Sequence, residues 1–348
     1  MSTTAPTGVP DHPGTAGTGL AARPVEPVAA TGSRVAAALQ RNGVAAFAAL
    51  ALLVLVGSVI WPSFHTLDNL RNTVLGNSYI GIVAIGMTLV IITGGIDLSV
   101  GSVFALGGVV GVYVSNQAGP VAAVLATIVA CGLIGLINGM LIGYARMAPF
   151  IVTLATLFGV RGLVYQLTGA GARTYSVPSD SFFAHLGTGV FLTIGYPVLI
   201  AIALYVVFHV VLERTPFGLT TLAIGGGEDA AVLMGLKVRR TKVSLYVVSA
   251  ALAGVAGMLQ AAQLVSASPI IATGYELQAI AAVVIGGTLL TGGAGSLIGT
   301  AAGVLLLGTI NAFIRELQLD STWNNVVSGA FLVTVVVVQR LLNYRRAD

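Results

Sequence analysis

The sequence predicts an all-α, polytopic integral membrane protein with about ten transmembrane helices and both termini in the cytoplasm. Charged residues make up only 8% of the 348 positions, and hydrophobic residues make up 56%. From Leu98 to Ala145 the chain contains no Asp, Glu, Lys or Arg, and its main interruption is the turn-forming segment Ser115–Pro120. A helix needs about 20 apolar residues to cross the hydrocarbon core, where no water satisfies an unpaired backbone group. This segment therefore predicts two successive membrane crossings.

Uncharged segments separated by turn signals give the predicted spans. They cover residues 44–61, 76–95, 98–114, 121–144, 149–168, 190–212, 243–265, 277–294, 296–314 and 322–340. With the N-terminus in the cytoplasm, twelve Lys and Arg residues fall on the cytoplasmic side, whereas only Arg71, Arg173 and Arg315 fall outside. Because cytoplasmic loops carry an excess of Lys and Arg, this distribution predicts cytoplasmic termini.

The chain divides into one membrane domain with a tail at each end. Residues 1–40 are rich in Thr, Gly, Ala and Pro and lack apolar periodicity, which predicts a disordered cytoplasmic tail. Residues 41–343 form the predicted transmembrane domain, and residues 344–348 a short cytoplasmic tail. No cleavable signal peptide is expected, because no apolar region follows a basic patch near the start. The first apolar run, Val44–Trp61, should therefore remain as an anchor.

Composition excludes several other classes of site. Gly fills 45 positions, well above the roughly 7% of ordinary usage, which suits close helix packing in lipid. The single Cys131 excludes an internal disulfide, and four scattered His residues predict no metal site. The net charge of +4 is explained by the excess of Lys and Arg in the predicted cytoplasmic loops, so it predicts no nucleic-acid partner. The basic cluster Lys237–Lys242 is either the flank of a span or a site for lipid headgroups.

The longest predicted cytoplasmic loop covers residues 213–242. Its apolar residues fall into two groups separated by the glycines Gly225–Gly227, which predicts two short amphipathic helices joined by a flexible corner. Glu228 and Asp229 stand at the start of the second helix, where carboxylates suit the helix dipole. The loop is either a capped interfacial connector or a docking element for a cytoplasmic partner.

A second segment places a carboxylate in an apolar region. Asp97 follows Gly94-Gly95, and the threading puts this break at the cytoplasmic edge. A carboxylate at membrane depth needs polar partners, and Thr93, Ser99 or backbone amides are the candidates. At the edge, Asp97 would instead cap a helix beginning at Leu98, which is the interpretation we favour over a gating role.

Two further features carry weaker signals. Arg161 is the one basic residue inside a predicted span, so it either has a functional role with hydroxyl or carbonyl partners or extends toward an interface. The segment Thr291-Gly292-Gly293 repeats the pattern Thr93-Gly94-Gly95. Internal duplication is common in transporters, although chance matches are frequent in a chain rich in Gly and Thr.

Missing motifs argue against an enzyme. The chain has no Gly-x-x-x-x-Gly-Lys-Ser/Thr phosphate loop, so it is not itself expected to be a nucleotide triphosphatase, and no cofactor is expected. No Ser/His/Asp or His-Glu-x-x-His arrangement is recognisable either. A membrane-embedded enzyme is therefore disfavoured.

Several motifs together carry a resemblance to a known family. They are Thr66-Leu-x-Asn69-Leu, Gly86-Met-Thr, Ile91-Ile-Thr-Gly-Gly-Ile-Asp-Leu-Ser-Val-Gly-Ser102, Thr215-Pro-Phe-Gly218, Ala223-Ile-Gly-Gly, Ala230-Ala, Gly286-Gly-Thr and Gly292-Gly-x-Gly-Ser-x-x-Gly-Thr300. With them, about residues 60 to 342 resemble the permease subunits of bacterial ATP-binding-cassette (ABC) sugar importers. This is the ribose/xylose/arabinose permease family, which is related to the branched-chain amino acid permeases.

The resemblance implies a permease in the inner membrane that works with other proteins. It implies a homodimeric pore, cytoplasmic ATPase subunits that bind ATP, and an extracytoplasmic binding protein that delivers a monosaccharide, with a pentose such as ribose or xylose expected. It makes the 213–242 loop the region on which the ATPase acts, through Phe217, Gly218, Gly225, Gly226, Glu228, Asp229 and Gly235. The candidate pathway or gating residues are Thr93, Asp97, Ser99 and Arg161.

Two positions depart from the family pattern, and one alternative function stays open. Leu219 stands where Arg commonly follows Phe-Gly, and Gly227 where Asn commonly precedes Glu. A stand-alone secondary carrier or channel would share this hydropathy. Ion-coupled carriers need ionisable residues within the membrane, and here only Arg161 is clearly available, with Asp97 at an edge.

Overall fold

The computed structural model describes residues 44–319 and isolated positions between Trp323 and Val337. The predicted tails 1–40 and 344–348, and most of the predicted span 322–340, lie outside the described residues. The helices are α2 Val44–Ile60, α3 Leu67–Ile92, α4 Val100–Gly143, α5 Pro149–Leu167, α6 Phe182–Thr188, α7 Tyr196–Arg214, α8 Pro216–Gly226, α9 Glu228–Leu233, α10 Val238–Gln263, α11 Tyr275–Ile285 and α12 Leu297–Glu316.

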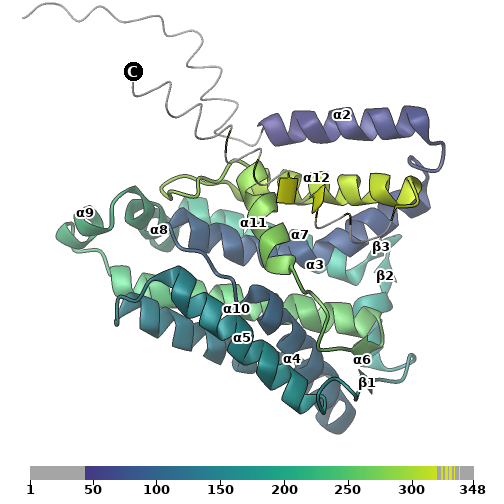
Figure 1. The fold of residues 1–348 in the computed structure, drawn as a ribbon, viewed down its shortest axis with the longest axis horizontal. Helices are drawn as coiled ribbons and strands as arrows, with labels where there is room; N and C mark the ends of the chain where they lie inside the picture. The colour runs from purple at the N-terminus through teal and green to yellow at the C-terminus, as the bar shows by residue number, and fades with distance from the viewer. Residues whose placement is uncertain are drawn as a thin grey trace, which may run out of the picture.

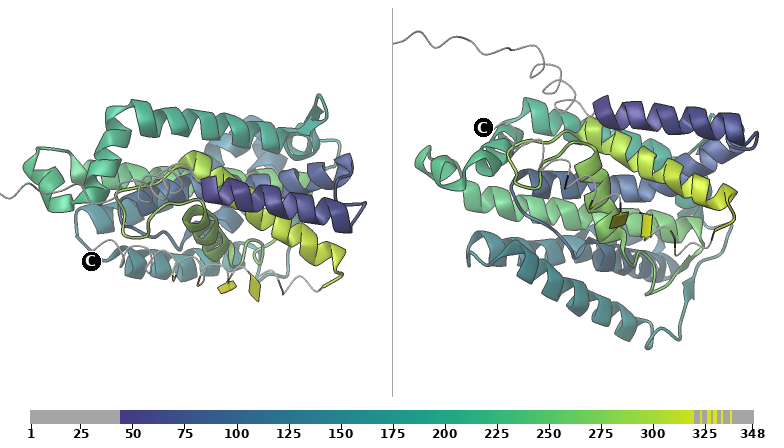
Figure 2. Two further views of the ribbon diagram at one scale, coloured as in Figure 1. Left: turned by 90° about the horizontal axis from the view of Figure 1, so that it is seen from above. Right: turned by 45° about the horizontal axis from the view of Figure 1, so that its top comes forward.

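Most of the long helices run along a common direction, so the molecule has two ends (Figure 1). One end carries α8 and α9, and we call it the α8–α9 end. The other, which we call the strand end, carries α6 and two short antiparallel pairs: β1 Tyr175–Ser176 with β4 Ser266–Ala267, and β2 Val190–Phe191 with β3 Ile194–Gly195. The two further views in Figure 2 show the same separation of the ends.

The helical composition supports the predicted membrane protein. Within residues 44–319, six helices are long and apolar enough to cross a membrane, namely α3, α4, α5, α7, α10 and α12, while α2 and α11 are shorter apolar helices. In the candidate spans of α3 and α10 most residues are buried inside the protein, so these helices form the centre of the bundle. Large apolar side chains on α5 and α7 remain exposed, as expected for helices that face lipid.

A sharp kink divides α4 into two arms. Gly119 has φ 83° and ψ 175°, outside helical values, and Pro120 follows it. Glycine adopts this positive φ readily, and the proline lacks the N–H that would continue the helical hydrogen bonds. Both arms pack on α10: Gly107 lies against Gly254 and Gly139 against Val243. The two crossings predicted from the turn Ser115–Pro120 correspond to these two arms.

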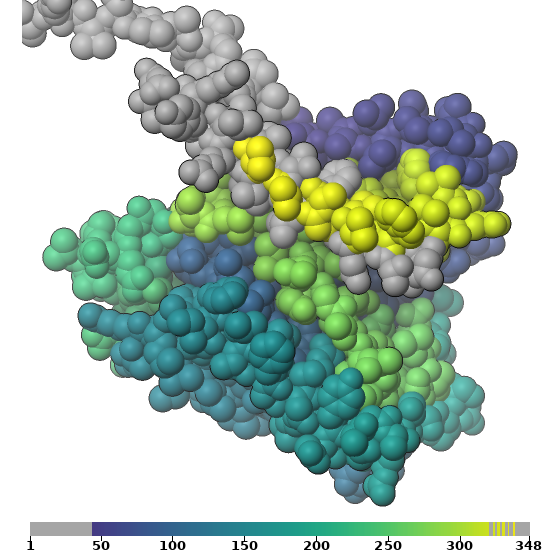
Figure 3. All heavy atoms as spheres, viewed as in Figure 1, coloured from purple at the N-terminus to yellow at the C-terminus, as the bar shows by residue number. Residues whose placement is uncertain are grey.

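The predicted continuous span 277–294 is wrong. The helix α11 ends at Ile285, and residues 286–296 form a loop before α12 begins at Leu297. Uncharged composition did not reveal this break because glycine and threonine, which interrupt the helix at Gly286-Gly287-Thr288, are also common in membrane helices. The short α11 runs across the direction of α10 and α12 in Figure 1, and its surface lies between those of α12 and α5 in Figure 3.

Candidate functional site

The α8–α9 end contains the two short helices predicted for the 213–242 loop. Pro216 begins α8, and the Thr215 hydroxyl caps it by accepting a hydrogen bond of 3.3 Å from the N–H of Gly218. Phe217 packs against the main hydrophobic core, so the start of α8 is anchored inside the protein. The prediction of two helices separated at the glycines is confirmed.

The corner between the helices exposes α9. Gly227 connects α8 to α9, whose first residue is Glu228, and Gly235 with φ 76° follows its end. On α9 and the residue after it, the side chains of Val232, Leu233 and Met234 are 56%, 89% and 67% exposed. Three adjacent exposed apolar residues on a charged end of the molecule are typical of a docking surface.

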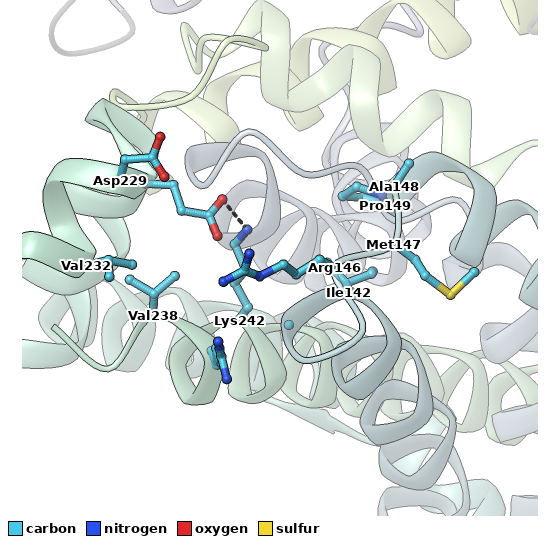
Figure 4. A pocket seen from close by; sticks show the side chains of 12 residues that line it. Ile142, Arg146, Met147, Ala148, Pro149, Asp229, Val232, Val238 and Lys242 are labelled. Atoms are coloured by element: carbon cyan, nitrogen blue, oxygen red, sulfur yellow. Dashed lines mark hydrogen bonds and ion pairs between the residues drawn. The ribbon is translucent and has the colours of Figure 1, made fainter.

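A cleft beside α9 combines both signs of charge. Its volume is about 460 Å³, and Figure 4 shows that its side chains come from the end of α4, the start of α5, α9 and α10. Within it the Lys242 ammonium lies 2.6 Å from the Glu228 carboxylate. Asp229 also lines the cleft, together with Arg146 and Arg239. The sequence analysis singled out Glu228 and Asp229 but did not pair them with cations; it interpreted the cluster Lys237–Lys242 as either the flank of a span or a site for lipid headgroups.

Behind this surface, the end of α8 meets two other segments through backbone atoms. The N–H of Gly293 donates to the carbonyl oxygen of Ile92 at 2.9 Å. A Cβ on Gly225 would overlap both that carbonyl oxygen and the nitrogen of Gly293. Gly292 also lies close to Gly94, because a Cβ on Gly292 would come within 2.8 Å of the backbone nitrogen of Gly94. We call this contact of Ile92–Gly94, Gly225 and Gly292–Gly293 the glycine junction; Gly226, in contrast, has open space where its Cβ would be.

The junction gives a structural meaning to the repeated Thr-Gly-Gly pattern. The two copies, at residues 93–95 and 291–293, are neighbours in space and both adjoin α8. Thr93 itself donates its hydroxyl to the Val90 carbonyl at 2.8 Å and so turns back on its own helix. It is therefore not the partner of Asp97.

Asp97 is fully buried inside the bundle and hydrogen-bonded on both carboxylate oxygens. One carboxylate oxygen accepts from the N–H and the hydroxyl of Ser99, at 3.1 and 2.6 Å, and the other accepts from the Ser249 hydroxyl at 2.9 Å. Ser249 lies eleven residues after Val238, roughly 16 Å along α10 from the α8–α9 end. After Gly95, whose Cβ position adjoins Tyr246, the chain packs against α10, and Asp97 is fully buried inside the protein. Its place relative to the membrane edge stays a prediction.

The predicted helix cap at Asp97 is wrong. The helix α4 begins at Val100 instead of Leu98, its N-cap residue is Ser99, and no side chain caps it. Asp97 instead accepts the backbone N–H of Ser99, two residues ahead in the loop that precedes the helix. It also joins the loop to α10 through Ser249. Ser99 extends this network, because its hydroxyl accepts from the Asn138 amide at 3.1 Å. Sequence reasoning missed Ser249 and Asn138, whose only signal was a polar residue within an uncharged span.

Arg161 lies apart from these contacts, on α5. Its Nη1 donates to the carbonyl oxygens of Pro269 and Ile271, at 2.6 and 3.0 Å, in the loop between β4 and α11. The carbonyl partners expected of a membrane arginine are therefore present, and the side chain points to protein. Glu276, at the start of α11, is close enough for its charge to attract Arg161. The sequence analysis did not single out Glu276.

Comparison with known proteins places this geometry in context. Residues 69–336 match the model of the family described as "Branched-chain amino acid transport system / permease component". The chain belongs to this permease family. No solved structure gives a significant match.

Curated relatives of this permease carry names of sugar transporters. The ribose import permease protein RbsC of Bacillus subtilis is 41% identical over 296 residues, which cover 84% of this chain and 91% of the relative. The protein of that name in Escherichia coli K12 is 37% identical over 292 residues, covering 83% and 91%. The L-arabinose permease protein AraH of Azospirillum brasilense is 35% identical over 303 residues, covering 86% of each.

These findings confirm the predicted family. The protein is a transmembrane permease of the sugar ABC importer type and a multi-pass protein of the cell membrane. Because its relatives are permease proteins, it is of the transport-subunit kind.

Proposed function

We propose that this permease translocates a monosaccharide, a pentose such as ribose or xylose, across the cytoplasmic membrane. ATP hydrolysis in a separate ABC ATPase subunit drives the movement, and an extracytoplasmic binding protein delivers the sugar. A second copy of the chain completes the pore within the lipid bilayer, and the permease itself binds no ATP. The observation that carries the proposal is the α8–α9 end, with its exposed apolar side chains beside a charged cleft.

The proposed orientation puts the α8–α9 end in the cytoplasm. The cleft residues Arg146, Arg239 and Lys242 lie there, and Lys237 and Arg240 line a neighbouring hollow. A concentration of basic residues favours the cytoplasmic face. Anionic lipid headgroups on that face are attracted to the same cations. In this orientation the ATPase subunit approaches α9 directly.

The coupling residues of the proposal form a short path into the bundle. Glu228 and Asp229 face the partner from the first turn of α9, and Gly235 ends that helix. Phe217 and Gly218 anchor the start of α8, and Gly225 brings its end into the glycine junction. Gly226 follows in the corner, where an added methyl group would meet open space, so the path runs through Gly225. Through the glycine junction, a shift of α8 reaches the break that carries Asp97 and the loop that precedes α12. Backbone-to-backbone packing transmits such a shift because it leaves no flexible side chain to absorb it.

A stand-alone carrier or channel is the alternative, and reconstitution separates the two. In proteoliposomes containing the permease, the ATPase subunit and the binding protein, uptake of radiolabelled ribose should require ATP and all three proteins. Permease alone should give no uptake above that of empty liposomes. Uptake by the permease alone, driven by a sugar or ion gradient, would contradict the ABC mechanism.

A further inference from the structure

A group of polar and aromatic side chains lies inside the bundle toward the strand end. Tyr79 of α3 donates its hydroxyl to the Gln263 side chain of α10, and Gln260 of α10 donates its amide to the Tyr275 hydroxyl of α11 at 3.4 Å. The ring of Tyr275 meets Phe104 edge to face, with centroids 5.3 Å apart. Hydroxyl, amide and aromatic groups of this kind suit a neutral, hydroxyl-rich ligand.

Two acceptors in this group are covered by protein and lack donors. They are Oε1 of Gln260 and Oε2 of Glu276. Exchanging the positions of the Gln260 side-chain oxygen and nitrogen would let the oxygen accept from the Tyr275 hydroxyl, but the nitrogen would then have no acceptor. One polar atom of Gln260 therefore lacks a partner in either orientation of the amide. A buried polar atom without a hydrogen bond destabilises the folded protein, so its presence in a native protein calls for an explanation. A ligand that supplies the missing hydrogen bond is one such explanation.

The surroundings of Glu276 leave its acceptor available. Gly101, in the first turn of α4, makes room for the carboxylate, since a Cβ there would overlap Oε2. The charge of Arg161 attracts the carboxylate, but Nη1 of Arg161 donates its hydrogen bonds to the carbonyl oxygens of Pro269 and Ile271. The ion pairs among the described residues do not include one between Arg161 and Glu276 within 4.0 Å. The charge of Arg161 thus acts on the carboxylate without a direct ion pair. The backbone N–H groups of Gly274 and Glu276 hydrogen-bond the carboxylate, and Oε2 is the oxygen that lacks a donor.

We propose that Glu276, Tyr275 and Gln260 contact the transported sugar, and this inference rests on the proposed function. The Glu276 carboxylate accepts a hydrogen bond from a sugar hydroxyl, the Gln260 side chain bonds a second one, and the Tyr275 ring packs on the C–H face of the sugar. In the present state α11 lies against α4 and closes these groups off. Movement of α11 away from Gly101 exposes them, and the loop that follows α11 leads directly to the glycine junction beside α8.

Two substitutions of Glu276 separate a sugar contact from a structural charge. Glu276→Met removes both acceptor oxygens, whereas Glu276→Gln removes the charge but keeps one acceptor and the side-chain shape. In the reconstituted complex, E276M should lower ribose uptake at least tenfold, and E276Q should retain a substantial part of it. ATP hydrolysis stimulated by the binding protein should stay within twofold of wild type in both. Equal losses in E276M and E276Q would show that the charge matters and would overturn the contact.

The matched control is Gln278→Met on the same helix. Gln278 follows Glu276 by two residues, roughly 200° around the helix, and should tolerate the same side chain with uptake within twofold of wild type. Uptake of ribose relative to a panel of monodeoxy riboses supplies a second measurement. Wild type should discriminate against at least one deoxy sugar. E276M should lose at least fivefold of that discrimination, whereas E276Q, which keeps an acceptor oxygen, should retain most of it.

The outcomes also separate this inference from the proposed function. If the wild-type complex imports none of ribose, arabinose, xylose and fructose, the proposed function fails. If wild type imports sugar and assembled E276M matches it in rate and in discrimination, the contact alone is wrong. Should E276M fail to assemble, E276Q decides, because loss of uptake and of discrimination in assembled E276Q would assign the role to the charge and overturn the contact.

Discussion

The N–H of Gly293 donates a 2.9 Å hydrogen bond to the carbonyl oxygen of Ile92, at the point where the end of α8 rests on both residues. This bond joins the end of α3 to the loop that precedes α12. Gly225 fits between them only because it lacks a side chain. The contact connects the surface proposed to receive the ATPase with both interrupted segments of the bundle.

Gly225→Ala should uncouple ATP hydrolysis from transport. A Cβ at this position overlaps two backbone atoms, neither of which turns aside as a side chain would, so α8 must shift away from the junction. We expect sugar uptake by the reconstituted complex to fall at least tenfold while ATP hydrolysis continues. Both rates are measured in the same proteoliposomes, normalised to inserted permease.

Gly226→Ala is the matched control for that variant. It adds the same methyl group one residue further along α8, where its Cβ meets open space, and its φ is not positive. Uptake and hydrolysis should both stay within twofold of wild type. If Gly225→Ala and Gly226→Ala show the same uptake and the same ATP hydrolysis, whether both are active or both inactive, the glycine junction does not couple the ATPase to transport.

Glu228 should affect the ATPase subunit more than the fold of the permease. The pair of Glu228 and Lys242 is partly exposed, and such pairs contribute roughly 0–1 kcal/mol to stability. Glu228→Ala should therefore leave the thermal unfolding temperature nearly unchanged in detergent while weakening capture of the ATPase subunit at least fivefold, as measured by surface binding.

Exchanging the charges of Glu228 and Lys242 distinguishes a contact of Glu228 with the ATPase from its ion pair within the permease. The double variant E228K/K242E rebuilds the pair with its charges reversed. If Glu228 faces the partner, the double variant should bind the ATPase as poorly as Glu228→Ala. Binding restored to the wild-type level would mean that the ion pair only positions α9.

Sequence patterns predicted the helical elements better than the contacts between them. The glycine corner Gly225–Gly227 predicted two short helices, and the turn Ser115–Pro120 predicted the division of α4, because both depend on local backbone preferences. The predicted helix cap at Asp97 was wrong, since its carboxylate instead joins the loop to Ser249 of α10. That contact depends on how the loop packs against a distant helix, which no local pattern specifies.

The candidate site shows the same limit. Arg161 stood out as a charge within an apolar run, but its carbonyl partners lie in a distant loop that no pattern associates with it. Glu276 passed unnoticed because it adjoins the predicted start of a span, where a carboxylate needs no explanation. The repeated Thr-Gly-Gly pattern was the one long-range signal in the sequence, and its two copies do meet at the glycine junction.

The termini should both lie in the cytoplasm, a prediction that rests on the distribution of Lys and Arg because the ends of the chain lie outside the described residues. A reporter that is active only in the cytoplasm, fused after Asp348, should be active. A fusion at Thr193, in the turn between β2 and β3 at the strand end, should be inactive with the same reporter. Activity in the opposite pattern would reverse the proposed orientation.

Asp97→Asn and Asp97→Ala should differ sharply. Asparagine keeps an oxygen for the N–H and hydroxyl of Ser99, and its amide can donate to the Ser249 hydroxyl, so the network around the loop survives. Alanine removes all three hydrogen bonds at a fully buried position and should destabilise the protein by about 2–4 kcal/mol. Thermal unfolding in detergent measures the stability, and uptake normalised to assembled complex measures the function. The Asp97→Asn variant should transport within about threefold of wild type if the residue acts through these hydrogen bonds. An asparagine variant that assembles and unfolds normally but does not transport would instead assign the negative charge itself to gating.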